Sequence, residues 1–234
     1  MFRFTLTVFS MVLAASACAA EVVRLATHDL PPYGSYRGGN ERFTGVAVDV
    51  VDCVMKRVSR PYQLLVVPWA RAQRLVQTGE ADGFFAASQN PERDAYAVRT
   101  LPIAPQEWRW YLLASNKADP LSAEFRQTGS VGSFLGANML DWLNRNGYKV
   151  EASPATTERL LQMLQLGRVD AILANHLVMD RLLREHKLEK SVRSVLQESK
   201  PLSVYFSKSF LAGSPGFLEA FNAQIEPCRA KGNE

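Results

Sequence analysis

Apolar residues between positions 22 and 227 fall into two alternating patterns. Short apolar runs predict β-strands, and segments whose apolar residues recur every three or four positions predict amphipathic helices. The clearest helix covers 46–58, where Val50, Val51 and Val54 share one face. The expected strands are 22–26, 64–67, 82–86, 110–114, 130–132, 148–152, 170–173, 192–197 and 202–206. This alternation predicts an α/β fold.

The same order of elements restarts near residue 130, which predicts two α/β lobes. Residues typical of helix starts mark several boundaries: Pro68 begins one helix, Asn90 caps the next, and Asn138 caps a helix of the second lobe. Ligands of α/β folds bind at the carboxyl ends of parallel strands. We therefore expect the ligand cleft between the lobes.

Residues 1–20 have a different character and predict a signal peptide. Arg3 is followed by the uncharged stretch 4–17, and small residues then surround Cys18. This order is typical of a secretory signal with cleavage before Glu21, and the stretch is shorter than the ~20 residues that span a bilayer. We expect export to the periplasm. Lipidation at Cys18 is the alternative, although Ala15 stands where a lipoprotein box has a large aliphatic residue.

Composition is that of an ordinary globular protein, and the motifs of several other classes are missing. The chain has 234 residues, 47% hydrophobic and 21% charged, with a net charge of +4. Its charges are interspersed, so no nucleic-acid partner is expected. The three histidines lack metal-ligand spacing, and the segment 132–136 has its serine one place too early for a nucleophile elbow. We expect no metal, no cofactor and no enzymatic activity.

Four landmarks spread along the mature chain carry a family resemblance. They are Thr27 with Pro31-Pro32-Tyr33 and Phe43-Thr44-Gly45; Pro68-Trp69-Ala70-Arg71 through Gly83; Asn90-Pro91-Glu92-Arg93 with Tyr96; and Val131-Gly132 with Gly136 and 167–171. In this order and spacing, the chain resembles the bacterial periplasmic solute-binding proteins of family 3, which serve amino-acid ABC importers. The Pro-Trp-x-Arg element resembles a divergent branch of that family.

The resemblance implies a type II periplasmic-binding-protein fold, in which two α/β lobes are joined by a two-strand hinge. Carried over, lobe 1 comprises 21–113 and 201–234, and lobe 2 comprises 114–200, with hinges near Ala114 and near 199–201. It also implies a monomer that closes on a small carboxylate-bearing, amino-acid-like ligand and delivers it to an ABC permease in the inner membrane.

The resemblance also implies site residues in lobe 1. Arg93 corresponds to the arginine that binds the ligand carboxylate, and a guanidinium matches a carboxylate with paired donors. Ser88 corresponds to the hydroxyl residue that binds the same group. Tyr33 and Trp69 are candidate aromatic walls, although core packing is equally typical of such residues. Arg71 is a candidate for a second acidic group, or a solvated surface residue.

Lobe 2 should contribute the turn from Ser133 to Asn138, whose backbone N–H groups favour an anion or polar edge. Asn175 departs from the family pattern, because related proteins place an acid there to pair with the ligand ammonium. A neutral amide cannot neutralise a buried positive charge. The ligand is then a carboxylate without an ammonium, or another acid such as Asp29 takes this part.

Cys53 and Cys228 are expected to form a disulfide. Cys53 follows Val46 by seven residues on the apolar face of its helix, and Cys228 continues the face of Phe221 and Ile225. An oxidising compartment permits the bond. The alternative is two separate buried thiols.

Two other functions remain open at this stage. One is a docking or sensory module whose partner is another protein. The other is an enzyme of the periplasmic dehydratase type, because one fold supports several functions. A pair of acids in the cleft would favour the enzyme.

Overall fold

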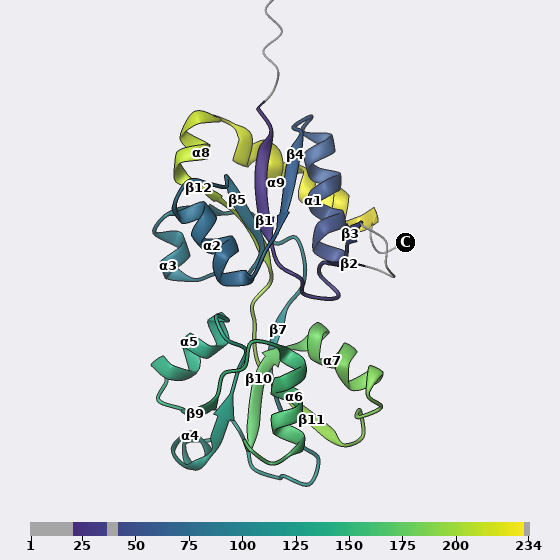
Figure 1. Cartoon of the computed structure of the whole chain (residues 1–234), viewed down its shortest axis with the longest axis vertical. Helices are drawn as coiled ribbons and strands as arrows, with labels where there is room; N and C mark the ends of the chain where they lie inside the picture. Colours follow the sequence, from purple (N-terminus) through teal and green to yellow (C-terminus); the bar gives the residue numbers. More distant parts are fainter. Residues whose placement is uncertain (1–20, 37–41, 232–234) are drawn as a thin grey trace, which may run out of the picture.

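A computed structural model describes residues 21–36 and 42–231. The predicted signal peptide 1–20, with Cys18, lies outside the described residues. Within the described ranges, no helix is long and apolar enough to cross a bilayer. Two α/β lobes, one above the other in Figure 1, confirm the predicted fold class.

Lobe 1 is built on a five-stranded sheet in the order β4-β1-β5-β12-β6. The strands are β4 (Tyr62–Val66), β1 (Val23–Thr27), β5 (Gly83–Ala87), β12 (Ser203–Ser207) and β6 (Ala97–Arg99). β1 runs parallel to β4 and β5, whereas β12 is antiparallel to β5 and β6. Its helices are α1 (Val46–Arg57), α2 (Trp69–Gln77), α3 (Pro91–Asp94), α8 (Lys208–Gly213) and α9 (Phe217–Lys231). A short ribbon of β2 (Ser35–Tyr36) and β3 (Phe43–Thr44) precedes α1.

Lobe 2 is built on a second sheet in the order β11-β7-β10-β8-β9. The strands are β11 (Val192–Ser199), β7 (Glu107–Leu113), β10 (Ala171–Asn175), β8 (Ser130–Gly132) and β9 (Lys149–Ala152). The helices are α4 (Ala123–Thr128), α5 (Asn138–Arg145), α6 (Thr157–Gln165) and α7 (His176–Glu185). β10 is parallel to β8 and antiparallel to β7, so the end of β10 and the beginning of β7 face the same edge.

The chain crosses between the lobes at 104–107 and at 199–203, where the two segments run side by side (Figure 1). The amide of Lys200 donates to Gln106 at 2.9 Å, and that of Leu202 donates to Ala104 at 2.9 Å. The lobe boundary predicted after residue 113 is therefore wrong, because β7 pairs with β10 and β11 in lobe 2. An apolar strand pattern is the same in either sheet, and only the pairing decides which sheet a strand joins.

Cys53 on α1 and Cys228 on α9 are joined in a disulfide, with their Cα atoms 5.8 Å apart. Around it, Val50, Val51 and Val54 of α1 are buried. Phe221 and Ile225 of α9 are buried in the same core. The bond ties the first helix of lobe 1 to the last, across a separation of 175 residues.

Candidate functional site

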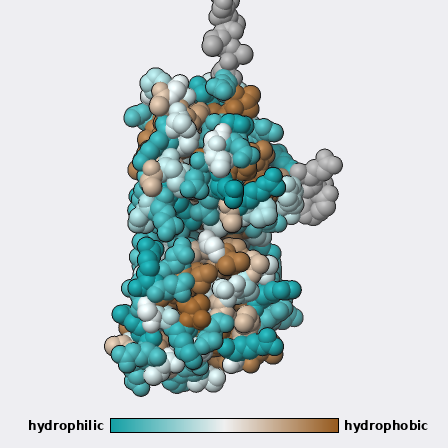
Figure 2. Space-filling model, turned by 60° about the vertical axis from the view of Figure 1, so that its left-hand side comes forward, coloured by the Kyte–Doolittle hydropathy of each residue, from teal (hydrophilic) through white to brown (hydrophobic). Residues whose placement is uncertain are grey.

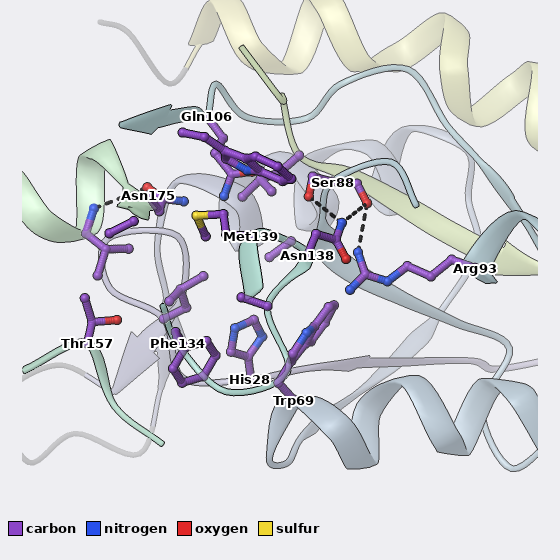
Figure 3. Close-up of a pocket in the computed structure, with 17 residues that line it drawn as sticks. His28, Trp69, Ser88, Arg93, Gln106, Phe134, Asn138, Met139, Thr157 and Asn175 are labelled. Carbon is purple, nitrogen blue, oxygen red and sulfur yellow. Dashed lines mark hydrogen bonds between the residues drawn. The ribbon is translucent and has the colours of Figure 1, made fainter. Parts of the chain in front are cut away.

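A pocket between the lobes collects the carboxyl ends of β1, β5 and β10 (Figure 3). Its volume is about 60 Å³. The lining from lobe 1 and the crossing segments is His28, Leu30, Trp69, Ala86, Ser88, Arg93, Gln106, Trp108 and Leu202; lobe 2 adds Phe134, Ala137, Asn138, Met139, Thr157, Ala174, Asn175 and Val178. The lining contains no Asp or Glu.

Arg93 lies in the first turn of α3, which Asn90 caps by accepting a hydrogen bond from Glu92 at 2.8 Å. Arg93 is 3% exposed as a residue, and its Cζ lies 5.0 Å from the ring centre of Trp69. Nε donates to Gln73 at 2.9 Å, and Nη1 donates to the carbonyl of Ser88 at 2.8 Å. These neutral acceptors hold the fork in place.

Burial lowers the pKa of Arg93 to about 10, so the group stays protonated at neutral pH. No acid among the described residues forms an ion pair with it. Its Nη2 likewise has no hydrogen-bond acceptor within the described part of the chain. Asp141 and Glu92 act on Arg93 without forming an ion pair, and they offset only part of the effect of burial on its pKa. An anion in the pocket would pair with the buried guanidinium directly.

Ser88 lines the pocket, but its hydroxyl already has a protein partner. Nδ2 of Asn138 donates to Ser88 Oγ at 2.8 Å and approaches the Gln89 carbonyl at 3.2 Å. Oδ1 of Asn138 accepts from Asn90 at 2.8 Å. Because Asn138 belongs to lobe 2 and its partners to lobe 1, these bonds hold the lobes together directly (Figure 3).

The prediction that Asn138 caps its helix is wrong. Ala137 occupies the cap of α5 without a side-chain bond, and Asn138 is the first helical residue. Its side chain instead reaches across the cleft to lobe 1. A polar residue before an apolar helical stretch suits either use, and local sequence cannot distinguish them.

Trp69 lines the pocket as one of the predicted aromatic walls. Its Nε1 donates to the Gly136 carbonyl at 3.1 Å, which is a second direct bond between the lobes. Gly136 has a φ of 77°, a left-handed conformation that favours glycine. The turn that presents the Gly136 carbonyl to Trp69 therefore favours glycine at this position.

Tyr33 is not a cleft wall, contrary to its prediction. It is fully buried, and its hydroxyl lies 2.8 Å from the Pro105 carbonyl and 3.1 Å from Asn175 Oδ1. The loop before it is held by α1, whose first amides donate to the carbonyls of Pro32 and Tyr33. Tyr33 thus supports the crossing segment and Asn175 from behind the pocket.

Ser133 and Arg71 are also outside the pocket. Ser133 is fully buried in lobe 2, where its hydroxyl donates to the Leu173 carbonyl at 2.9 Å. Arg71 is an exposed residue of α2, in agreement with the solvated alternative. The predicted substitute acid, Asp29, lies in a wider outer groove, where partial loss of solvation raises its pKa.

Asn175 ends β10 and caps α7, and its Oδ1 accepts from the Val178 amide at 3.4 Å. The residue is 5% exposed and lines the pocket on the side opposite Arg93 (Figure 3). Its Nδ2 is buried without a hydrogen-bond partner among the described residues. The position predicted to meet the far end of the ligand therefore does face the pocket.

His28 is the main pocket residue that sequence reasoning missed. It follows β1 directly, and its ring centre lies 4.6 Å from that of Trp69. Burial, and then the charge of Arg93, lower the pKa of His28 to about 4, so the imidazole is neutral at pH 7. His28 directly follows a predicted strand, and this position at a strand's carboxyl end could have identified it as a pocket residue. Gln106, Trp108 and Met139 were missed as well.

Apolar surface gathers around the junction of the two lobes (Figure 2). The outer groove at this junction is lined in part by Pro31, Val66, Pro68 and Leu135, and Leu135 is 54% exposed. An apolar rim surrounds the polar groups inside, as is typical of small-molecule sites.

Comparison with known proteins finds no matching family model and no matching curated protein. Among solved structures, the substrate binding protein of an amino acid ABC transporter is 15% identical, with a TM-score of 0.70 over 90% of this chain and 94% of that chain. A histidine kinase sensor domain similar to periplasmic binding proteins is 16% identical, with a TM-score of 0.75 over 92% of each chain.

The GluR0 ligand-binding core from Nostoc punctiforme, in complex with L-glutamate, is 15% identical, with a TM-score of 0.72 over 90% of this chain and 94% of that chain. At these identities the likeness concerns the fold alone. The chain has the type II periplasmic-binding-protein fold, as predicted.

Proposed function

We propose that this chain is an exported solute-binding protein that closes its two lobes on a small carboxylate-bearing solute without transforming it. The observation that carries the proposal is Arg93, a buried arginine that lines the pocket and has no acid in direct ion-pair contact among the described residues. A ligand carboxylate would supply that charge, and the low dielectric of a closed cleft strengthens the pair.

Delivery to an ABC permease is the finer part of the proposal. The substrate binding protein of an amino acid ABC transporter shares the fold, and the leader at 1–20 fits export to the periplasm. We propose a monomer, because one chain holds both halves of the pocket. Opening would break the bonds of Asn138 and of Trp69 and expose the site.

A sensory module is the second candidate, and the kinase sensor domain with the same fold favours it. Both functions need solute binding, so the pocket does not separate them. The partner does: a transport protein binds its permease when closed, whereas a sensory module binds a signalling protein. The pocket lining offers no pair of acids for an enzyme of the dehydratase type.

A thermal-shift screen of the mature chain against amino acids, short carboxylates and polyamines tests the proposal, because a ligand of the folded state raises the melting temperature. Calorimetry then compares variants. Arg93→Ala should weaken binding of a carboxylate hit by about 2–5 kcal/mol, the usual effect of removing one partner of a buried charged pair.

Arg71→Ala, which removes an exposed arginine of α2, is the matched control and should bind normally. Arg93→Lys should recover part of the affinity, because an ammonium keeps the charge but loses the fork. Undiminished binding by Arg93→Ala would remove the basis of the proposal.

A further inference from the structure

We infer that the lobe 2 end of the pocket selects a hydrogen-bond acceptor, so that the solute is a short carbonyl-bearing monocarboxylate, an oxo acid, and not an amino acid. The inference rests on the proposed function and names the ligand class for that same site. It follows from the orientation of the Asn175 amide and from the charges around the pocket.

The orientation of the Asn175 amide is set by its role as a helix cap. The backbone N–H of Val178 can only donate, so the atom facing it must be the acceptor Oδ1. The Tyr33 hydroxyl, whose single proton is within reach of both the Pro105 carbonyl and Oδ1, lies 3.1 Å from the same oxygen. Nδ2 therefore points away from the helix, toward the pocket (Figure 3).

Nδ2 of Asn175 is a buried donor without a partner in the described part of the chain. Leaving such a group unpaired is costly, and a carbonyl oxygen of the solute would satisfy it. An ammonium in the same place could not satisfy it, because the ammonium and Nδ2 are both hydrogen-bond donors.

The charges of the pocket point the same way. Arg93 already contributes one positive charge, and the lining offers no carboxylate. The neighbouring imidazole of His28 can share a hydrogen bond but has no charge to offset a second cation. The small volume of about 60 Å³ favours a short solute, and apolar side chains such as Met139, Phe134 and Val178 also line the pocket.

Two sets of matched acids test the inference by calorimetry. One set is pyruvate, propionate and alanine; the other is 4-oxopentanoate, pentanoate and 4-aminopentanoate. Within each set only one substituent changes, from oxo to hydrogen to ammonium. In the set that binds, the oxo acid should bind about tenfold more tightly than the unsubstituted acid, the effect of one net hydrogen bond. The ammonium compound should bind most weakly.

Asn175→Asp should reverse this preference. A carboxylate oxygen can still accept from Val178, so α7 keeps its cap, but the donor facing the pocket becomes an acceptor with a charge. The amino compound should gain at least about tenfold and the oxo acid should lose about tenfold. Asn144→Asp, an exposed residue of α5, makes the same charge change outside the pocket and should leave both affinities unchanged.

The possible results separate the two proposals. If the wild-type chain binds an amino compound as tightly as its oxo partner, and binding depends on Arg93, the inference is wrong while the proposed function stands. If none of the six acids binds but another carboxylate from the thermal-shift screen does, and its binding depends on Arg93, the inference is likewise wrong while the proposed function stands. Should Asn175→Asp fail to fold, as melting curves would show, the wild-type comparison alone decides.

Discussion

Lobe 1 brings a guanidinium and an imidazole to the pocket, whereas lobe 2 brings two side-chain amides, Asn138 and Asn175. The guanidinium of Arg93 is held by acceptors of its own lobe, and its position does not depend on closure. The amides meet lobe 1 only when the lobes are together. In the proposed function, charge attraction to the solute therefore acts from lobe 1, and lobe 2 recognises the solute through hydrogen bonds.

The lobes also differ in how they are held. A disulfide joins α1 and α9 of lobe 1, so its two sequence-distant parts are linked covalently. The described part of lobe 2 has no cross-link, and it is one continuous segment between the crossings. Lobe 1 is thus the cross-linked lobe that carries the charge of Arg93, and lobe 2 contributes neutral amides. Each prediction below tests one part of this contrast.

Removal of the disulfide should have the largest effect. The double variant Cys53→Ala, Cys228→Ala should lose up to about 5 kcal/mol of unfolding free energy, because a loop of 175 residues is no longer closed in the unfolded chain. The loss should be confined to lobe 1. Denaturant unfolding followed by tryptophan fluorescence mainly reports lobe 2, which holds Trp108, Trp110 and Trp142, whereas far-UV circular dichroism reports both lobes.

The double variant should therefore unfold in two steps, with the dichroism change beginning before the fluorescence change. A single coincident transition with less than about 1 kcal/mol lost would contradict the picture of a covalently strengthened lobe 1.

The second largest effect should come from acidification, which should lower the free energy of unfolding through His28 in lobe 1. The pKa of His28 is about 4 in the folded chain and 6.5 in the unfolded chain, so the unfolded state binds the proton more readily between these values. The free energy of unfolding should fall as pH drops from 6.5 to 4, by about 3 kcal/mol at most. Measurements of unfolding at several pH values check this.

His28→Gln is the matched variant for this prediction, because it keeps a neutral polar side chain without the titration. Its unfolding free energy should lose the part of the pH dependence that His28 supplies. An equal slope in both proteins would show that other groups cause the acid sensitivity.

Loss of the Asn138 amide should have a smaller effect, on closure and not on folding. Asn138→Ala removes bonds to Ser88 and Asn90 across the cleft and should disfavour the closed state by about 1–2 kcal/mol. Small-angle scattering should then show a larger radius of gyration. Asn146→Ala, whose amide bonds to Trp142 within lobe 2, is the control and should leave the scattering unchanged.

Much of this protein could be predicted from its pattern of apolar and polar residues. Strands and helices of both lobes, the cap at Asn90 and the pairing of two cysteines on apolar helix faces depend on local periodicity and chemistry. Trp69 and Arg93 also line the pocket, as the resemblance implied. Local signals suffice for these features because neighbouring residues generate them.

Tertiary structure alone decided which side chains meet. Asn138 reaches lobe 1 instead of capping a helix, Tyr33 supports Asn175 from behind, and Ser133 is buried in lobe 2. β7 joins lobe 2 because it pairs with β10 and β11. The paired residues lie more than 60 positions apart in the sequence, so no local pattern around β7 could reveal them. A side chain with several hydrogen-bonding uses takes the partner that folding brings near, and that proximity is not encoded in its immediate neighbours.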